Sequence, residues 1–175
     1  MKVQILREAG YEEAMLGLSL SYERDPAGMP AVMERLFDKG GGHNKFLESM
    51  VVWLDVVAPR HFWQQFDTYR TGMTKQSGST MHTLTRRPLG QEDFDRPLPP
   101  ETLLRLNALV AEKQLEELKN ELPEGFLQRR ILCTNYMTLR NIVAQRKTHR
   151  NPAWRVFCTE LLRQVARPEF FKDLA

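Results

Sequence analysis

The sequence predicts an α+β fold, because strand-like and helix-like segments both occur but do not alternate regularly. Residues 2–6 (KVQIL) alternate in polarity, and residues 50–57 (MVVWLDVV) are rich in β-branched and aromatic side chains. Other segments space their apolar residues at helical intervals. At least three strands and about five helices are expected, with helices before, between and after the strands. This order argues against a repeating βαβ chain.

The length and composition fit one ordinary globular domain spanning residues 1–175, with 42% apolar and 27% charged residues. No apolar run approaches the roughly 20 residues of a membrane span. The N-terminus lacks the basic-then-apolar layout of a signal peptide. Cys133 and Cys158 do not have the spacing of a metal site and are expected to be reduced thiols. We therefore expect a cytoplasmic protein with no metal site and no membrane partner.

Helical segments are predicted between the first two strands. The first covers residues 11–22, and its candidate core residues are Ala14, Leu16, Leu18 and Leu20. The second covers residues 31–38, begins after Gly28-Met29-Pro30 and ends at a pair of glycines. A short helix that opens at His43 or Asn44 then runs to residue 48.

Residues 42–82 combine the most varied features of the chain. Asp55 is the one charge in the predicted strand 50–57, so it requires an edge position or a partner. Pro59 suits the first turn of a following helix, which carries several aromatic residues and Gln65. Residues 72–79 (GMTKQSGS) are predicted to form a polar loop whose backbone N–H groups can hold an anion.

A proline-rich loop and a long helix follow. Residues 84–100 contain four prolines, and this segment is long enough to form a lid or an interface arm. Residues 103–118 are predicted to form one helix with an apolar stripe, which Leu122-Pro123 brings to an end.

Residues 126–147 are predicted to form a single helix. On that helix Asn135, Leu139, Ile142 and Arg146 share one face, and the first and last lie roughly 16 Å apart along the axis. A buried amide and a buried guanidinium are costly without partners. Either they pair with backbone or carboxylate groups, or they read a ligand of flavin or nucleotide size. A last helix opens at Asn151-Pro152 and runs to residue 166 with Trp154 inward.

The charge is distributed unevenly. Residues 126–175 hold ten Lys and Arg against three Asp and Glu, a net charge of +7, whereas residues 1–125 carry −4 of the total of +3. A basic C-terminal third suits an anionic partner, either the phosphates of a small molecule or a nucleic acid. Alternatively, these basic residues bind no partner and only form the solvated surface of helices.

In the segments 42–82 and 126–147 described above, the chain resembles the flavin-dependent thymidylate synthases, which methylate dUMP using methylenetetrahydrofolate, FAD and NADPH. The family's Gly-His-x-x-x-x-Glu-His segment corresponds to residues 42–49 (GHNKFLES). Gln65 then stands before residues 68–70 (TYR), where the family's Arg-His-Arg signature begins. The family's Asn-x-Arg-Ser-Leu corresponds to residues 135–139 (NYMTL), and Arg146 follows eleven residues after that Asn, as in the family. The spacings agree over nearly the whole chain.

The chain departs from the family at several motif positions. Thr68 and Tyr69 replace the first Arg and the His of the signature, and Gln76 replaces its carboxylate. Met137 replaces the Arg of Asn-x-Arg-Ser-Leu, and residues 77–82 (SGSTMH) replace the phosphate-binding Ser-x-Arg-Tyr. The region 83–100 is reduced, as it is in compact, phage-type members of the family. These departures make the fold a firmer inference than the activity.

The resemblance implies a fold and a set of roles. It implies an antiparallel sheet flanked by helices, with a long C-terminal helical region, and a homotetramer whose active sites are shared between subunits. Arg146 would stabilise negative charge on the pyrimidine ring, and Gln65 would read the base edge by donating and accepting hydrogen bonds. The implied substrate-binding set is Gln65, Arg70, Gly78, Ser79, Thr80, Lys119 and Arg146. The implied flavin-facing set is His43, Tyr69, Arg70, Gln76, Asn135 and Asn141.

Each of these residues also has a plain structural interpretation. His43 can cap a helix, and Gln65 can satisfy a backbone group. Lys119 can be a solvated charge at a helix C-terminus, where the helix dipole favours it. Arg70 can pair with Asp67 or Asp55.

Two other functions remain open from the sequence. The first is a non-catalytic nucleotide- or flavin-binding relative, which the altered signature favours. The second is a nucleic-acid-binding protein that uses the basic segment 128–150, with a strongly salt-dependent affinity. We rank nucleic-acid binding last, because no recognition motif accompanies the basic residues.

Overall fold

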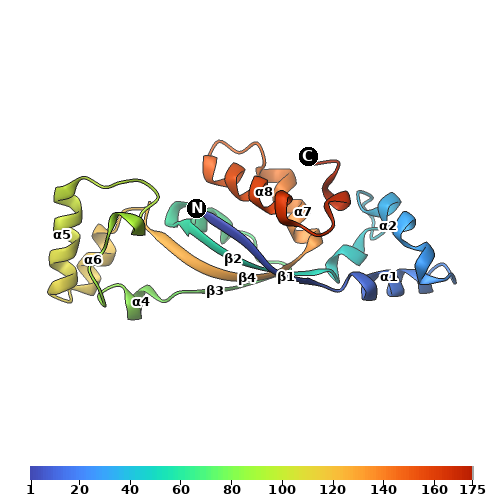
Figure 1. Cartoon of the computed structure of the whole chain (residues 1–175), viewed down its shortest axis with the longest axis horizontal. Helices are drawn as coiled ribbons and strands as arrows, with labels where there is room; N and C mark the ends of the chain where they lie inside the picture. The colour runs from blue at the N-terminus through green and yellow to red at the C-terminus, as the bar shows by residue number, and fades with distance from the viewer. Residues whose placement is uncertain (175) are drawn as a thin grey trace.

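The computed structural model describes residues 1–174 and contains a four-stranded antiparallel sheet with the strand order β1-β2-β4-β3 (Figure 1). The strands are β1 (Lys2–Ala9), β2 (Val51–Pro59), β3 (Met73–Ser77) and β4 (Leu127–Asn135). The predicted α+β class and the antiparallel sheet are therefore confirmed. The predicted strands 2–6 and 50–57 are the cores of β1 and β2.

Within residues 1–174, eight α-helices and four short 3₁₀ helices connect and flank the strands. The α-helices are α1 (Tyr11–Leu20), α2 (Pro30–Leu36), α3 (Arg60–Phe66), α4 (Thr80–Thr83), α5 (Pro100–Ala111), α6 (Leu115–Glu121), α7 (Tyr136–Arg146) and α8 (Pro152–Gln164). The 3₁₀ helices are η1 (Pro26–Gly28), η2 (Lys45–Glu48), η3 (Gln91–Asp93) and η4 (Pro168–Phe171). The short helix expected up to residue 48 is η2, and the last predicted helix is α8.

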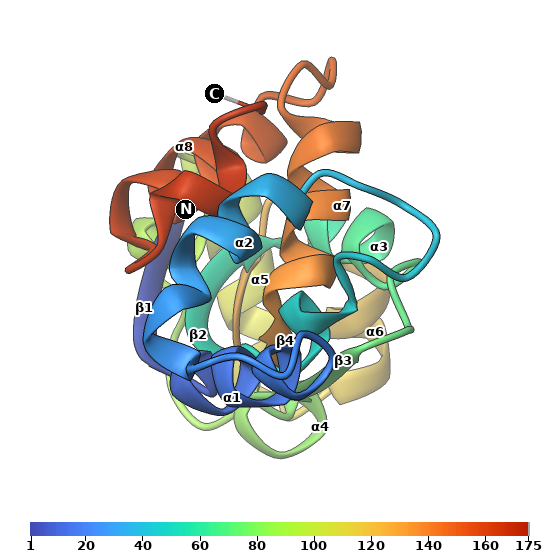
Figure 2. The same ribbon diagram turned by 90° about the vertical axis from the view of Figure 1, so that its right-hand side faces the viewer.

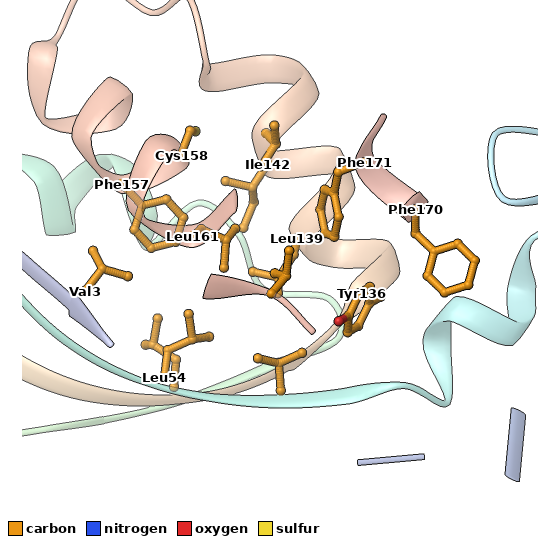
Figure 3. Close-up of a cluster of buried hydrophobic side chains, with 14 of the residues drawn as sticks. Val3, Leu54, Tyr136, Leu139, Ile142, Phe157, Cys158, Leu161, Phe170 and Phe171 are labelled. Carbon is orange, nitrogen blue, oxygen red and sulfur yellow. The ribbon is translucent and has the colours of Figure 1, made fainter. Parts of the chain in front are cut away.

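Helices α7 and α8 cover one face of the sheet, as both views show (Figure 1 and Figure 2). Burial alternates along β2, because every second side chain points at these helices. Leu54 of β2, Leu139 of α7 and Leu161 of α8 are completely buried in this layer (Figure 3). The aromatic residues of α3 and α8 complete the core: Phe62, Trp63, Phe66, Trp154 and Phe157.

The C-terminal segment closes this core at the other end of α7. Phe170 and Phe171 of η4 are buried, and the guanidinium of Arg140 in α7 donates to the Phe170 carbonyl. The same guanidinium donates to the two carboxylate oxygens of Asp173, at 2.9 Å each. These hydrogen bonds hold the pKa of the Asp173 carboxyl below its usual range. Arg140 also lies 4.7 Å from the ring centroid of Phe37.

The Asp173 ion pair predicts an acid-dependent loss of stability. The pKa of Asp173 is lower in the folded state than in the unfolded state. The ionised carboxylate therefore contributes to the free energy of unfolding above the unfolded-state pKa of about 3.9, and this contribution is lost as the pH falls through the folded-state pKa. We expect Asp173→Asn to lower the unfolding free energy at pH 6, with the difference from wild type shrinking below about pH 4. Urea denaturation across pH measures this, and Asp38→Asn, at an exposed position, is the control. A pH-independent difference would contradict it.

The opposite face of the sheet, here called the outer face, has no helix packed over it in the part of the chain that the structure describes (Figure 1). Trp53 and Val57 of β2 and Ile131 of β4 lie on it and are only partly buried. Asp55 also lies there and pairs with Arg129 across the strands at 2.5 Å, which is the partner that its place in a strand required. The outer face is therefore a partly apolar surface.

Helices α5 and α6 and the preceding loop form a lobe at one end of the sheet (Figure 1). The lobe has its own hydrophobic cluster, made of Leu84, Leu89, Phe94, Leu106, Leu109, Val110, Leu118, Leu122 and Phe126. The side chain of Asn107 accepts from the backbone N–H of Leu89 at 2.7 Å and donates to its carbonyl at 3.0 Å. The proline-rich segment is thus packed into the lobe and is not a free lid or arm. The single-domain prediction stays a prediction.

Three predicted elements are wrong. Residues 126–147 are not one helix, because 127–135 pair along their length with β2 and in part with β3, and Asn135 ends the strand and caps α7. Residues 72–79 are not all loop, because β3 pairs there with β4. The predicted helix 103–118 is broken into α5 and α6 at Lys113, which adopts a φ of 56°.

Helix α1 buries a different face from the one predicted. Ala14 is 4% exposed as expected, but Leu16 is 53% exposed and Leu20 is 72% exposed. The reason is that α1 packs mainly against the short segments η1 and η2 at the end of the sheet, with Tyr11 also contacting Phe170 of η4, so much of its surface faces away from the core.

Candidate functional site

A cleft lies where β4 passes into α7. Asn135 is the last residue of β4 and the N-cap of α7, and its side-chain oxygen accepts from the Thr138 N–H at 2.9 Å. The turn before β3 approaches this cap closely. A Cβ on Gly72 would lie 2.5 Å from the Thr138 hydroxyl and 3.1 Å from the Asn135 amide nitrogen, and Gly72 has a φ of +67°. Only glycine fits there without strain, so it fixes the turn 68–72 against α7.

The cleft has a volume of about 540 Å³ and lies between this turn and α7. Tyr69, Arg70, Asn135 and Asn141, four of the predicted flavin-facing residues, lie around it, and Glu48 closes one side. Arg70 is exposed and forms no ion pair in residues 1–174. The structure therefore gathers most of the predicted flavin-facing residues into one polar cleft.

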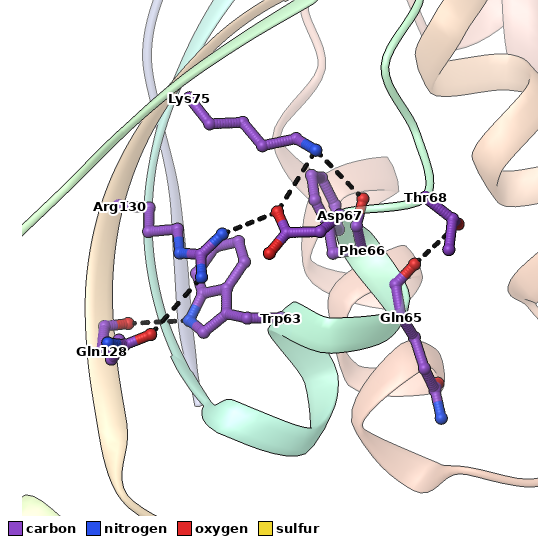
Figure 4. Close-up of polar contacts among 8 residues, drawn as sticks. All are labelled: Trp63, Gln65, Phe66, Asp67, Thr68, Lys75, Gln128 and Arg130. Carbon is purple, nitrogen blue, oxygen red and sulfur yellow. Dashed lines mark hydrogen bonds and ion pairs between the residues drawn. The ribbon is translucent and has the colours of Figure 1, made fainter. Parts of the chain in front are cut away.

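Asp67 is not a partner of Arg70. Its carboxylate binds Lys75 at 3.3 Å and Arg130 at 2.8 Å (Figure 4). The guanidinium of Arg130 lies 4.4 Å from the ring centroid of Trp63, whose indole N–H donates to the Gln128 carbonyl at 3.0 Å. Since Asp55 is taken by Arg129, both proposed carboxylate partners of Arg70 are occupied by other cations.

A second set of polar side chains contacts the buried indole of Trp154 or is linked to it through Arg146. The Trp154 N–H donates to the Gln65 side-chain oxygen at 2.7 Å, and the Arg146 guanidinium lies 4.9 Å from the indole centroid. The Arg146 Nε donates to the Tyr69 hydroxyl at 2.8 Å, and this hydroxyl donates to the Gln145 side-chain oxygen at 2.9 Å. Tyr69 thus joins the cleft to the two residues predicted to act on a pyrimidine.

The remaining predicted site residues lie elsewhere in the chain. His43 is exposed beside a cavity of about 760 Å³ between α1 and η2. Gln76 and Gly78 lie with Ile131 in a shallow hollow on the outer face. Thr80, next to Ser79, lines a small cavity of about 150 Å³ with Lys119 and Arg60, and the Lys119 amine lies 3.0 Å from the Met81 sulfur. One copy of the chain therefore does not bring the whole predicted set together.

Sequence reasoning missed the roles of Trp154 and Gln145. Trp154 was expected only as a core residue of the last helix, and its indole N–H bond to Gln65 spans 89 positions in the chain. Asn151, the N-cap of α8, donates to the same Gln65 oxygen at 3.4 Å. A tryptophan three residues after an Asn cap was the only local signal, and it does not reveal the partner.

The buried titratable groups are in unreactive forms. Burial raises the pKa of the Cys158 thiol to about 11, so it stays protonated at neutral pH. Burial and the hydrogen bond that Tyr136 donates to Glu8 at 2.6 Å raise the pKa of the Tyr136 hydroxyl above its usual range. Both cysteines are free thiols. Neither Cys158 nor Tyr136 is prepared as a nucleophile.

Within residues 1–174, no three His, Cys, Asp or Glu side chains come together in a group that could hold a metal ion. Over the same residues, no helix has both the length and the apolar character needed to cross a bilayer.

The chain has the fold of the flavin-dependent thymidylate synthases. Two crystal structures of ThyX from Helicobacter pylori, both in complex with FAD and dUMP, superpose with TM-scores of 0.83 and 0.85. Each comparison covers 99% of this chain and 99% of the other, at 16% and 14% sequence identity. No family model matches the sequence. No curated protein matches it either. At this identity the likeness establishes the fold.

Proposed function

We propose that the protein is a flavin-dependent enzyme that methylates C5 of a pyrimidine deoxynucleotide such as dUMP. The observation that carries the proposal is the cleft at the start of α7, where Tyr69, Arg70, Asn135 and Asn141 gather in a chain with the fold of enzymes that bind FAD and dUMP. In the proposed reaction, a methyl group replaces the C5 hydrogen. Its carbon comes from methylenetetrahydrofolate, and its two reducing electrons come from NADPH.

The groups around the cleft suit part of an FAD molecule. The oxygen of Asn135 is used by the Thr138 N–H, so its amide nitrogen remains as a donor beside Gly72. The Asn141 amide and the Arg70 guanidinium, which has no ion-pair partner within residues 1–174, add donors for ring carbonyls and for a pyrophosphate. Bound FAD would supply the hydride chemistry, while the protein supplies binding and orientation.

Arg146 and Gln65 are the proposed pyrimidine-binding residues. The guanidinium of Arg146 would stabilise the negative charge that develops on a ring carbonyl during the reaction. Its orientation is supported by two contacts, the hydrogen bond to Tyr69 at 2.8 Å and the indole of Trp154 at 4.9 Å. Such preorganised donors are effective because they need no rearrangement when the charge appears.

The proposed function is tested by absorbance and turnover. Purified protein titrated with FAD is expected to retain a flavin band that dUMP perturbs, and the complete mixture is expected to release tritium from C5-labelled dUMP. A flavin band without tritium release would favour the second candidate, a non-catalytic binding relative. The observations that favour this candidate are the replaced signature residues Thr68, Tyr69 and Gln76. A protein that neither binds flavin nor responds to dUMP would contradict both candidates.

The basic segment 128–150 does not suit the third candidate function, nucleic-acid binding. The basic segment 128–150 is divided between β4 and α7 and does not form one continuous basic helix. Three of its arginines are committed to carboxylates: Arg129 to Asp55, Arg130 to Asp67 and Arg140 to Asp173.

We also propose that the chain assembles into a homotetramer through its outer face. Two observations support this: the predicted site residues are spread over separate places in one chain, and Trp53, Val57 and Ile131 form a partly apolar surface with no helix over it in residues 1–174. Assembly would bring residues from different copies into one site and would bury this surface.

An acidic substitution on the outer face tests the assembly. Val57→Asp is expected to convert a tetramer into smaller species in light scattering coupled to size exclusion, because it places a carboxylate in the apolar interface. We expect the isolated chain to tolerate this change, because Val57 lies between Lys2 and Arg129 on the neighbouring strands. Leu104→Asp, at a position on α5 that is 73% exposed, is the control. An unchanged mass for Val57→Asp would place the interface elsewhere.

A further inference from the structure

The indole N–H of Trp154 fixes the orientation of the Gln65 side chain. Trp154 is completely buried, and its ring stacks on Phe66 with the centroids 5.7 Å apart and the planes 13° apart. An indole N–H can only donate a hydrogen bond. The atom 2.7 Å from it must therefore be the oxygen of the Gln65 amide, which also accepts from Asn151 at 3.4 Å.

The free end of Gln65 is consequently a donor. With the oxygen used by Trp154 and Asn151, the amide NH₂ group is the part that remains for a ligand. Figure 4 shows the Gln65 side chain extending from α3 with its nitrogen at the tip. A glutamine that is free to rotate offers either a donor or an acceptor, as the sequence analysis expected, whereas this one offers only N–H groups.

Arg146 adds further donors beside the same indole. A tyrosine hydroxyl has one hydrogen, and that of Tyr69 is donated to Gln145 at 2.9 Å, so its oxygen accepts from the Arg146 Nε at 2.8 Å. The terminal amino groups of the guanidinium have no partner within residues 1–174. A guanidinium has no acceptor, so the side chains of Gln65 and Arg146 both present N–H groups only.

We propose that Trp154 is a positioning residue that makes this part of the site a donor-only surface, which selects a pyrimidine with a carbonyl group, and not an amino group, at position 4. The inference rests on the proposed function, in which Gln65 and Arg146 meet the base. Uracil and cytosine both carry the O2 carbonyl, and they differ at position 4, where uracil has a carbonyl oxygen and cytosine an amino group. With a donor of this surface facing position 4, uracil offers it an acceptor, whereas cytosine would place one N–H group against another and leave both unsatisfied.

Gln65→Glu is the decisive variant, because it keeps the side-chain shape while its free end becomes an acceptor and gains a negative charge. One carboxylate oxygen still accepts from Trp154, and the other becomes an acceptor toward the base. Wild type with FAD is expected to bind dUMP at least about tenfold more tightly than dCMP in calorimetry, and Gln65→Glu is expected to reverse that preference. Gln64→Glu adds the same charge at an exposed neighbouring position and is expected to leave the ratio unchanged.

Trp154→Phe tests the positioning residue itself. It removes the N–H and keeps a ring under Arg146, so the Gln65 amide becomes free to rotate and the ratio of dUMP to dCMP affinity is expected to fall below about threefold. Because Trp154 is buried and this variant can fail to fold, the free wild-type protein provides a second measurement. In its nitrogen-15 NMR spectrum, the Trp154 indole N–H is expected to exchange slowly with water and to shift strongly in Gln65→Glu.

The outcomes distinguish a failure of the donor-only site from a failure of the proposed function. Equal affinity ratios in wild type and Gln65→Glu would overturn the donor-only site while leaving the proposed function intact. A rapidly exchanging indole N–H that Gln65→Glu does not shift would overturn the positioning role of Trp154. If wild type binds neither nucleotide, the proposed function fails and the selectivity fails with it, whereas the NMR result still decides whether Trp154 holds Gln65.

Discussion

Replacing Arg146 with alanine is expected to lower tritium release from C5 of dUMP by roughly 10²- to 10³-fold, the usual effect of removing one preorganised donor from a charge-stabilising site. The assay contains FAD, NADPH and methylenetetrahydrofolate. A large effect is expected because Tyr69 and Trp154 already orient the guanidinium, so that in the proposed reaction it needs little rearrangement when charge develops on the pyrimidine.

Two other variants make this result specific. Arg150→Ala removes the same charge from an exposed position four residues away and is expected to retain most of the activity. Arg146→Lys keeps the charge but loses the planar arrangement of donors, so an intermediate rate is expected. Activity of Arg146→Ala within about twofold of wild type would exclude a role for Arg146 in stabilising charge on the pyrimidine.

Phe66→Ala is expected to lower the free energy of unfolding by about 3–5 kcal/mol, measured by urea denaturation at a fixed protein concentration. Phe66 is completely buried and lies at the centre of the aromatic cluster. Its ring centroid is 5.7 Å from that of Trp154, 5.4 Å from that of Phe62 and 5.6 Å from that of Phe157. Truncation leaves a cavity that these rigid rings cannot fill.

The same substitution is expected to disturb the polar group on Trp154. Without Phe66 the indole loses its stacking partner, so the Trp154 N–H resonance should shift as well. Phe66→Leu keeps most of the volume and should cost less than Phe66→Ala, while Leu104→Ala at the 73% exposed position should change stability by less than about 0.5 kcal/mol. A Phe66→Ala loss below about 1 kcal/mol would show that the cluster collapses around the gap.

The sequence was sufficient for elements whose local pattern agrees with their final environment. Strand β2 is rich in β-branched residues and lies in the middle of the sheet, and α8 begins at an Asn cap followed by proline. In both cases the local preference and the tertiary contacts favour the same structure. Strand β1 was predicted for the same reason, although the prediction ended it at residue 6 and the strand runs to Ala9.

The failures occur where distant contacts decide the structure. Residues 127–135 include Leu, Gln and Arg, which favour helices, but they form a strand because β2 and β3 lie on either side. Strand β3 is short, polar and at the sheet edge, so it resembles a loop in sequence. The break at Lys113 uses a left-handed lysine instead of glycine, and a lysine there does not signal a break.

The candidate site was predictable as a set of residues and not as a geometry. Motif spacing pointed to Tyr69, Arg70, Asn135 and Asn141, which the structure places around one cleft. It gave no indication that Tyr69 holds Arg146, because these residues are 77 positions apart and one of them departs from the family pattern. Which of Gln65's two amide ends is left without a partner depends on the Trp154 N–H, so it could not be predicted from Gln65 alone.

The separate hydrophobic cluster of the α5–α6 lobe gives this fold a region where its length can change. The lobe is built on the far ends of β2 and β4, and its seam with α3 is polar, as in the contact of 3.5 Å between His61 and Asp95. Insertions or deletions between residues 84 and 121 would alter the lobe without repacking Phe66, Trp154 or Leu139. Homologues can therefore diverge in size there while the residues that hold Arg146 and Gln65 stay in place.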